Sequence, residues 1–494
     1  MGTPDSAFER DVQPTRTNRS KTPITYSRDS VLRYRVNDIQ EIVDNPSILL
    51  KMIQHHHERQ VPRLVILEDY YLGNNTTIVT GSRRIENDKS DHRIRHGWAS
   101  IISDFINSYV LSNPIKIDGA TDEFSEVIEE FNQGNDIDAH NVELGKDQNN
   151  FGRAYELLQR TEDDSDRIYQ LDPRTVFMIY DRTVRTRVIG ACRYYQVDEF
   201  DSEGESKKYE IELYTFNKIY SYEPTDIYTG KLTESNVIDH LFGGVPIIEY
   251  RSDRFKMGVY EKQIPLIDAY DAAQSDTANY MTDFNDAILA IYGRVANAED
   301  SEYVKTMRDM NILFLIPEDS GFEGKSSVSA GYLTKSYDVA GVEAYKDRIK
   351  EDIFTTGSAP NLSDSSFSGN KSGEALKYKM FGLQQKKSDK EKYFSKGLRV
   401  RYRLLENLKR TVKELSGNEN NLTFGFTENL PKAYLEELQA FISSGGVLSQ
   451  KTMLSLPSFV ENVEAELENI EQEQNERYGM IDFVGGQGVD HDQS

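Results

Sequence analysis

The segment that comes closest to a catalytic motif is 321–326, which follows an apolar run as a phosphate-binding loop would. The loop pattern G-x-x-x-x-G-K-[ST] requires Gly at position 319, where this chain has Asp319. Glu318 and Glu323 add negative charge where a phosphate would lie, and the residues after Lys325 predict a strand where the pattern needs a helix. We therefore expect no nucleotide site there, and an NTPase acting through Lys325 is only a rival hypothesis.

Two other clusters have residue types suited to a metal site but the wrong geometry. Residues 55–57 are three successive histidines, and successive helical residues point about 100° apart, so the three rings cannot converge on one ion. Residues 136–147 begin like a calcium loop, but Asn141 and Asp147 stand where the loop needs Gly and Glu. We interpret the second segment as a polar surface helix and expect no metal.

The composition gives no support to an enzyme. The chain has 494 residues, with 58 Lys and Arg against 82 Asp and Glu, a formal net charge of −24. Acid pairs are so frequent that no glycosidase-like pair stands out, and no serine or cysteine nucleophile motif is present. Cys192 is the single cysteine, which excludes an intrachain disulfide and a cysteine-based zinc site. We expect a non-enzymatic protein without a cofactor, whose negative field opposes tight binding of nucleic acid.

A long helix is predicted over residues 259–287, and its side chains divide into two faces. Apolar and small residues at three- and four-residue steps predict a packing face: Leu266, Tyr270, Ala273, Thr277, Met281, Phe284 and Ile288. Polar residues follow another side: Asp268, Asp271, Ser275, Asn279, Asp283 and Asp286. The pattern predicts a helix that packs through its apolar face and exposes an acidic one.

The remaining segments indicate a multi-domain chain that mixes helices and strands. Residues 1–36 predict a mobile arm, 37–60 a helical region, and 151–250 an antiparallel sheet with strands near 175–180 and 209–216. A compact α/β insert follows, with strands at 288–291, 311–316 and 327–334 and a helix at 299–310. Next come a helix over 342–354, an exposed Ser, Gly and Asn loop over 358–370, and a helix of about 40 residues from Ser372 that bends near Gly382 or Gly397. No run of about 18 apolar residues occurs, so we expect neither a signal peptide nor a membrane span.

The last long helix is basic, and its charge has two interpretations. Residues 371–413 hold 14 Lys and Arg against 4 Asp and Glu, whereas residues 457–494 hold 10 acids against Arg477 alone. Six cations could contact phosphates: Lys386, Lys387, Lys390, Arg399, Arg401 and Arg403. The same side chains could instead pair with this chain's own acidic surface or a neighbour's, and the net charge favours this structural interpretation.

A set of motifs begins with the stretch 266–279, with Leu266-Ile267-Asp268-Ala269-Tyr270-Asp271-Ala272-Ala273-Gln274, and continues through 360–364, 367–370, 372–373 and 375–379. The upstream stretches 70–75, 141–146 and 152–156 and the later stretches 448–452 and 454–457 belong to the same set. These motifs resemble those of the portal proteins of long-tailed bacteriophages, and the stretches from 266 to 379 follow the family's order and spacing. The resemblance covers residues 40–475 and leaves out the arm and the last 20 residues.

The resemblance implies an α+β portal fold that assembles as a dodecameric ring at one capsid vertex. It implies a wing at 37–257, stem helices at 258–287 and 340–356, a clip at 288–339, a tunnel loop at 357–371, a long wing helix at 372–425, and a crown with an acidic tail at 426–494. The ring would be the conduit for DNA packaging and ejection. A nucleic-acid-binding scaffold or packaging factor acting through residues 371–413 is the alternative.

The resemblance also implies partners and site residues. The partners are further copies of the chain, the terminase large subunit, a head–tail adaptor, the major capsid and scaffolding proteins, and transiently held double-stranded DNA, with no membrane. The ring would be assembled in the bacterial cytoplasm and would belong to the virion. The expected lining of the DNA channel is Asp268, Asp271, Asp276, Asp283 and Asp286. The expected tunnel-loop residues are Asn361, Leu362, Ser363, Asp364, Phe367, Asn370 and Lys371.

Overall fold

The computed structural model divides the chain into two compact units, 1–429 and 430–494. It describes residues 28–80, 90–197, 207–284, 288–292, 305, 312–315, 329–333, 338–359, 380–412, 415, 421–428, 463, 466–467 and 470. The expected arm therefore lies outside the described residues except for its last few positions, among them the short helix η1 (Asp29–Val31). The first unit holds all the elements discussed below.

A six-stranded sheet forms the centre of the strand-rich part of the chain. Its order is β1 (Tyr34–Val36), β5 (Val176–Asp181), β6 (Val188–Gln196), β7 (Tyr209–Tyr214), β8 (Lys218–Thr225) and β9 (Glu234–Asp239). Strands β5–β9 pair antiparallel, which confirms the prediction, whereas β1 adds to β5 in parallel. The sequence pattern missed β1 because three residues are too few to show a period.

A second sheet packs against the first, so that β5 is buried on both faces. It has the order β10 (Ile247–Arg251), β3 (Arg153–Arg160) and β4 (Asp166–Leu171). Along β5, Val176 and Met178 join the core between the two sheets, while Phe177 and Ile179 join the core under the first helices. This alternation follows from the two-residue period of a strand, and it explains why the run is apolar throughout.

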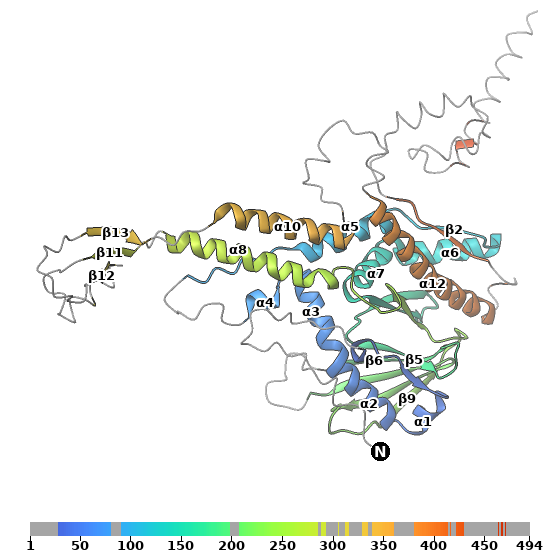
Figure 1. The fold of residues 1–494 in the computed structure, drawn as a ribbon. Helices are drawn as coiled ribbons and strands as arrows, with labels where there is room; N and C mark the ends of the chain where they lie inside the picture. Colours follow the sequence, from blue (N-terminus) through green and yellow to red (C-terminus); the bar gives the residue numbers. More distant parts are fainter. Residues whose placement is uncertain are drawn as a thin grey trace, which may run out of the picture. The chain divides into compact units, whose positions relative to one another are not determined.

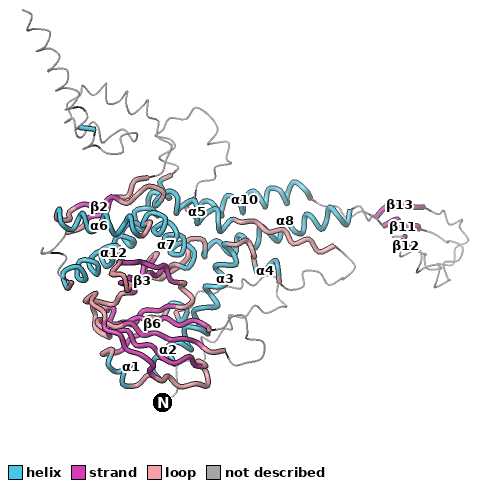
Figure 2. Tube along the Cα trace, turned by 180° about the vertical axis from the view of Figure 1, so that it is seen from behind, coloured by secondary structure: helices cyan, strands magenta, loops and turns pink. Residues whose placement is uncertain are grey.

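Helices cover the outer face of the six-stranded sheet. They are α1 (Gln40–Asp44), α2 (Ser47–His55) and the π-helical turn η2 (His56–Gln60), while α3 (Val61–Tyr71) follows η2 and packs against other helices. Ile42, Leu49 and Ile53 point into the core with Phe177 and Ile179. The helical region predicted at 37–60 is confirmed, and the apolar run after it is also helical. Figure 2 shows this strand-rich part apart from the helices α5 (Trp98–Leu111), α8 (Ile264–Phe284) and α10 (Val339–Gly357).

A helical layer lies against the other side of the three-stranded sheet. It includes α4 (Thr76–Val79), α5 (Trp98–Leu111), α6 (Asp122–Gly134), α7 (Ile137–Phe151) and α12 (Phe381–Thr411), with a small sheet of β2 (Lys116–Asp118) and β14 (Thr423–Gly425). Helix α7 contacts β3, and α12 contacts β10. The segment expected to be a polar surface helix lies in the helix α7, but Asn141 and Leu144 are buried, so the surface placement is wrong.

Helix α12 confirms the predicted long helix over its described residues. Leu383, Phe394, Leu398, Leu405 and Leu408 are buried on one face, as the spacing indicates. Packing explains why position 397 is a glycine, because a Cβ there would lie 2.2 Å from the ring of Tyr250 on β10. The missing side chain lets helix and sheet approach closely.

Helices α8 (Ile264–Phe284) and α10 (Val339–Gly357) run side by side (Figure 1), and the short helix η3 (Glu261–Gln263) precedes α8. Between them in sequence lies a sheet of the order β12 (Ile312–Leu315), β11 (Ile288–Tyr292) and β13 (Ser329–Leu333). All three strands and both helices agree with the predictions. The helix predicted at 299–310 lies outside the described residues except for Lys305, which is helical.

Candidate functional site

Helix α8 buries the polar face that the sequence pattern left exposed. Asp268 accepts hydrogen bonds from the Tyr70 hydroxyl at 2.6 Å and the Thr77 hydroxyl at 3.0 Å, and is 8% exposed. Asp271 is fully buried, accepts a hydrogen bond from Asn75, and lies 2.7 Å from Nδ1 of His96. Both carboxylates are therefore internal groups of this chain.

The same face holds an extended segment, residues 90–97, which we call the strap. The backbone N–H of Ile94 donates to the Ser275 hydroxyl at 3.0 Å, and the N–H of His92 donates to the Asn279 side chain at 2.7 Å. A chain without regular structure has unpaired backbone groups that need partners when they are covered. Ser275 and Asn279 supply these partners, while Asp268 and Asp271 on the same side of α8 accept hydrogen bonds from side chains of the covering segments. This is why polar residues, and not the apolar stripe, occupy the buried face.

The apolar stripe of α8 is only partly covered in the described chain. Tyr270 packs edge-on against Trp98 at 5.4 Å between ring centres, and Trp98 makes the same kind of contact with Phe354 on α10. The single tryptophan thus joins α5, α8 and α10. Met281, further along the stripe, is 50% exposed. The prediction that this stripe alone does the packing is therefore wrong.

The five expected channel residues have different positions. The exposed placement is wrong for Asp268 and Asp271, because the strap and α3–α4 region cover them. Asp276 is exposed on α8. The side chain of Asp283 and the whole of Asp286 lie outside the described residues, as do all the expected tunnel-loop residues: Asn361, Leu362, Ser363, Asp364, Phe367, Asn370 and Lys371.

The second helix of the pair carries an acidic row that the sequence analysis missed. Glu343, Asp347 and Glu351 are exposed and follow one another at four-residue steps, so they share one face of α10. Lys346 and Ile349 are buried on another face, and the Lys346 ammonium reaches Gln274 of α8 at 3.2 Å. The repeat of acids at this spacing was the signal available in the sequence.

Burial of Asp268 has a consequence for pH dependence. Burial raises the pKa of Asp268 to about 6, although its hydrogen bonds from Tyr70 and Thr77 act in the opposite direction. Because the folded chain holds the proton more tightly than the unfolded chain, stability is highest below pH 4 for this group and is lost as the pH rises through 6.

We expect Asp268→Asn to remove this pH dependence, because an amide cannot ionise. Between pH 4 and pH 7.5, the unfolding free energy of the variant should gain about 2.5 kcal/mol relative to the parent chain. Urea unfolding at both pH values measures this difference. Asp276→Asn, an exposed change on the same helix, is the control and should behave like the parent. Parallel pH profiles for Asp268→Asn and the parent would contradict the assignment.

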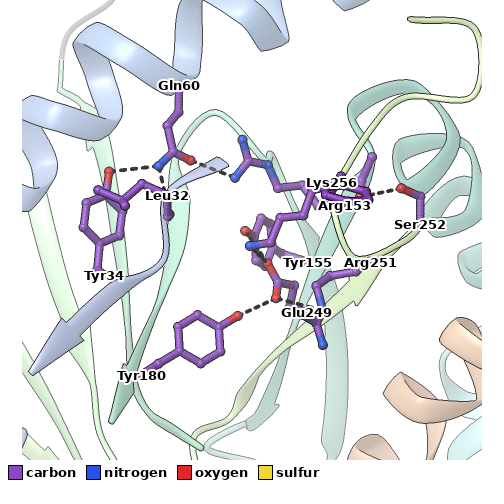
Figure 3. Close-up of polar contacts among 12 residues, drawn as sticks. Leu32, Tyr34, Gln60, Arg153, Tyr155, Tyr180, Glu249, Arg251, Ser252 and Lys256 are labelled. Atoms are coloured by element: carbon purple, nitrogen blue, oxygen red, sulfur yellow. Dashed lines mark hydrogen bonds and ion pairs between the residues drawn. The ribbon is translucent and has the colours of Figure 1, made fainter. Parts of the chain in front are cut away.

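A buried polar cluster fixes the start of α8 to the two sheets (Figure 3). Glu249 accepts hydrogen bonds from Tyr155 at 3.1 Å and Tyr180 at 2.6 Å, and pairs with the Lys256 ammonium at 2.5 Å. Burial raises the pKa of Glu249, but Lys256 and Arg251 outweigh it and bring this pKa to about 2. The carboxylate is therefore charged and paired at neutral pH.

The backbone on either side of this cluster is tied to the first helices. The carbonyl of Lys256 accepts a hydrogen bond from Arg63 of α3 at 3.1 Å, and Arg63 forms a buried ion pair with Glu261 of η3 at 2.5 Å. Figure 3 also shows Gln60 between Tyr34 and Arg153, with its amide donating to Tyr34 and its oxygen accepting from Arg153. These contacts make α8 an extension of the sheets and not an independent arm.

Two of the six candidate phosphate-binding cations are used inside the protein. Arg401 is fully buried and holds Glu156 through two hydrogen bonds, at 2.9 and 2.5 Å. The buried ammonium of Lys390 donates to Asn107, Asn149 and the Gly145 carbonyl. Both residues lie on the apolar stripe of α12, and this position was the sequence signal for buried cations. The predicted pairing with an acid of the same chain is confirmed for Arg401, whereas Lys390 is held by amide and carbonyl oxygens.

The other four candidates lie nearer the surface. Lys387 pairs with Glu391 at 3.2 Å and Glu428 at 2.9 Å, whereas Lys386, Arg399 and Arg403 are exposed. Of the histidine triplet, His56 is buried with Nδ1 2.7 Å from the Tyr194 hydroxyl. Within the described ranges no group of three His, Cys, Asp or Glu side chains could hold a metal, and none of the helices there could span a membrane.

Comparisons with known proteins agree with the resemblance seen in the sequence. The chain is 24% identical over 474 residues to the portal protein of Bacillus phage SPP1, which covers 91% of this chain and 89% of that protein. It is 23% identical over 424 residues to the portal protein of Clostridium phage phiCD119, covering 80% of this chain and 89% of that one.

Solved structures and a family model complete the comparison. A chain from the neck of an empty GTA particle computed with C6 symmetry has a TM-score of 0.40 at 12% identity, covering 78% of this chain and 98% of that chain. A chain from the virion of a native gene transfer agent particle has a TM-score of 0.42 at 13% identity, covering 80% and 93%. The family model "Phage portal protein, SPP1 Gp6-like" matches residues 50–479. Since that match spans most of the sequence, the chain belongs to the SPP1 Gp6-like family of phage portal proteins.

Proposed function

We propose that twelve copies of this chain form a closed ring at one capsid vertex, through which DNA enters and leaves the phage head. The observation that carries the proposal is the family match over residues 50–479. The ring would also dock the terminase motor and the head–tail adaptor. The docked motor would be the packaging enzyme, and the portal itself would not be an enzyme. Its place is the portal vertex of the virion.

The elements of the structure divide naturally among the parts of such a ring. The two large sheets and helices α1–α7, with α12, correspond to the wing, and α8 with α10 corresponds to the stem. The sheet β11–β13 lies between the stem helices in sequence and corresponds to the clip. Residues 357–371 would be the tunnel loop and 426–494 the crown. The firm attachment of α8 to the sheets supports a stem that transmits force to the wing.

The acids that face DNA are assigned differently from the sequence-based expectation. Asp268 and Asp271 are buried, so we assign the channel wall to Asp276 of α8 and to Glu343, Asp347 and Glu351 of α10. A conduit must pass a polyanion without holding it. Carboxylates repel phosphates, whereas Lys or Arg at the same positions would release counterions and bind them.

The ring itself is the first testable result. We expect the purified chain to form particles of roughly 680 kDa, twelve times the chain mass of 56.6 kDa. Light scattering coupled to gel filtration measures the mass, and negative-stain images should show rings with a central hole. Only monomers or dimers at every protein and salt concentration would contradict the proposed function, whereas rings of thirteen copies would not.

A further inference from the structure

Helix α12 has an exposed row of cations that the described chain does not neutralise. The row consists of Lys392, Lys396, Arg399 and Arg403, at steps of four, three and four residues, so the four side chains share one face. Lys392 makes only a long, exposed pair with Asp389, at 3.7 Å. No described carboxylate lies within 4.0 Å of the other three cations, in contrast to the paired Lys387 and Arg401. We call these four residues the basic row.

The surroundings of the basic row strengthen its positive field. Burial lowers the pKa of Lys396, and the nearby Arg251 and Arg33 lower it further while Glu249 acts in the opposite direction, so two more cations lie near the row. Lys392 and Arg399 also line a groove of about 380 Å³ that includes Phe424 and Phe426. A surface with this charge fits an acidic partner. The aromatic side chains that line the groove can also cover part of the partner's apolar surface.

Helix α6 of the same chain has the complementary charge. Its five acids, with no Lys or Arg among them, are all exposed: Asp122, Glu123, Glu126, Glu129 and Glu130. Its apolar residues Phe124, Ile128 and Phe131 are buried, so the acidic side faces outward. The acids recur at three- and four-residue steps, like the cations of the basic row. We call these five residues the acidic row.

We propose that the basic row of one copy binds the acidic row of the next copy around the ring. The proposal rests on the ring proposed above. A cyclic ring needs a heterologous interface, in which two different surfaces of one chain meet, and the two rows are such a pair. At 1.5 Å per residue the acidic row is about 12 Å long and the basic row about 16 Å long, so several charges can pair at once.

Charge favours this occupant over nucleic acid. Each chain carries a net charge of −24, so neighbouring copies repel one another unless opposite charges are placed at their contact. The same net charge opposes a stable grip on DNA. Pairing the exposed cations with the acids of a neighbouring copy therefore offsets this repulsion and lowers the free energy of ring assembly.

Two sets of charge reversals test the contact. Lys392→Glu, Arg399→Glu and Arg403→Glu reverse the basic row, and Glu123→Lys, Glu126→Lys and Glu130→Lys reverse the acidic row. Each variant alone places like charges at every contact, and we expect its ring fraction to fall about tenfold or more. In an equimolar mixture, alternating copies restore opposite charges at every contact, so rings should return. Ring fraction is measured by light scattering and negative stain, and circular dichroism checks the fold.

A matched control separates a specific contact from a change in net charge. Arg182→Glu, Arg185→Glu and Arg187→Glu reverse three exposed arginines in the β5–β6 connection and should leave rings intact. Intact rings from either row variant alone, or no recovery in the mixture, would overturn the contact while the parent rings uphold the proposed function. Normal rings that have lost DNA retention in the basic-row variant would assign the row to nucleic acid instead. A parent chain that forms no rings would overturn both proposals.

Discussion

Replacing Glu343, Asp347 and Glu351 by Lys is expected to leave rings intact and to block DNA packaging. The three side chains are exposed on α10, but Glu343 also pairs with the buried ammonium of Lys346, so circular dichroism and the ring mass check that the variant folds. Every copy would then present cations where the proposed channel wall has carboxylates. Phosphates would bind these cations and release counterions, and passage would require breaking these contacts repeatedly. We expect filled heads to fall about tenfold or more in a packaging assay, with a partial recovery at high salt.

The control for this variant carries the same change in charge at another place. Glu223 is exposed on β8, and Glu234 and Asp239 are exposed on the edge strand β9 of the six-stranded sheet, which does not include the helix pair. Their replacement by Lys should leave packaging unchanged. Normal packaging by the α10 variant would show that this face of the helix does not line the channel, whereas loss of packaging in both variants would point to a general charge effect.

Replacing Arg401 by Met is expected to lower the unfolding free energy by about 3–5 kcal/mol. Glu156 is completely buried and also accepts hydrogen bonds from Tyr250 at 2.7 Å and from His140 at 3.0 Å. Without the guanidinium, these groups would have to stabilise a buried carboxylate alone. Methionine keeps most of the aliphatic volume, so the loss measures the missing charge and not a cavity. Denaturant unfolding at pH 7 measures the difference.

Two further variants make this result specific. Arg403→Met, an exposed arginine on the same helix, should change the unfolding free energy by less than about 1 kcal/mol. Glu156→Gln combined with Arg401→Met leaves no unpaired charge and should recover part of the loss. An Arg401→Met variant as stable as the parent would show that the buried pair is not needed for stability.

The Glu156 site also predicts the response to acid. Burial raises the pKa of Glu156, but Arg401 and His140 reverse this effect and bring the pKa to about 2. Since the folded pKa lies below the unfolded value, the pair contributes its full stability above about pH 4.5 and loses it as the pH falls toward 2. This dependence is opposite in sign to that of Asp268.

The sequence predicted which segments are helices and strands far better than it predicted which faces are buried. The spacing of residues 259–287 gave α8 to within a few residues at each end. Its buried face could not be predicted, because the strap that covers Ser275 and Asn279 comes from a segment about 180 residues earlier, and its unpaired N–H groups have no pattern of their own. Any hydropathy scale scores a polar helix face as hydrophilic. The score is the same whether water or another segment's backbone forms the hydrogen bonds to that face.

The basic helix shows the same limit in another form. Its charge and length were evident, and the structural interpretation anticipated internal pairing. Which cations turn inward depends on acceptors contributed by α5, α7 and β3, as for Lys390 with Asn107 and Arg401 with Glu156. Only the placement of Lys390 and Arg401 on the apolar stripe could have indicated them. The tunnel-loop assignment remains a prediction from the resemblance alone.

The parallel pairing of β1 with β5 has a consequence for how the chain is made. Strand β1 pairs with a strand roughly 140 residues later, and Ile42, Leu49 and Ile53 share a core with that strand. At about 5–20 residues per second, a ribosome needs roughly 7–30 s to supply β5 after β1 has been synthesised. During that interval the first helices have no sheet to cover. A nascent chain therefore completes its N-terminal region only after β5 has been translated, and truncated chains that end before β5 should be recognised by chaperones and proteases before they can assemble.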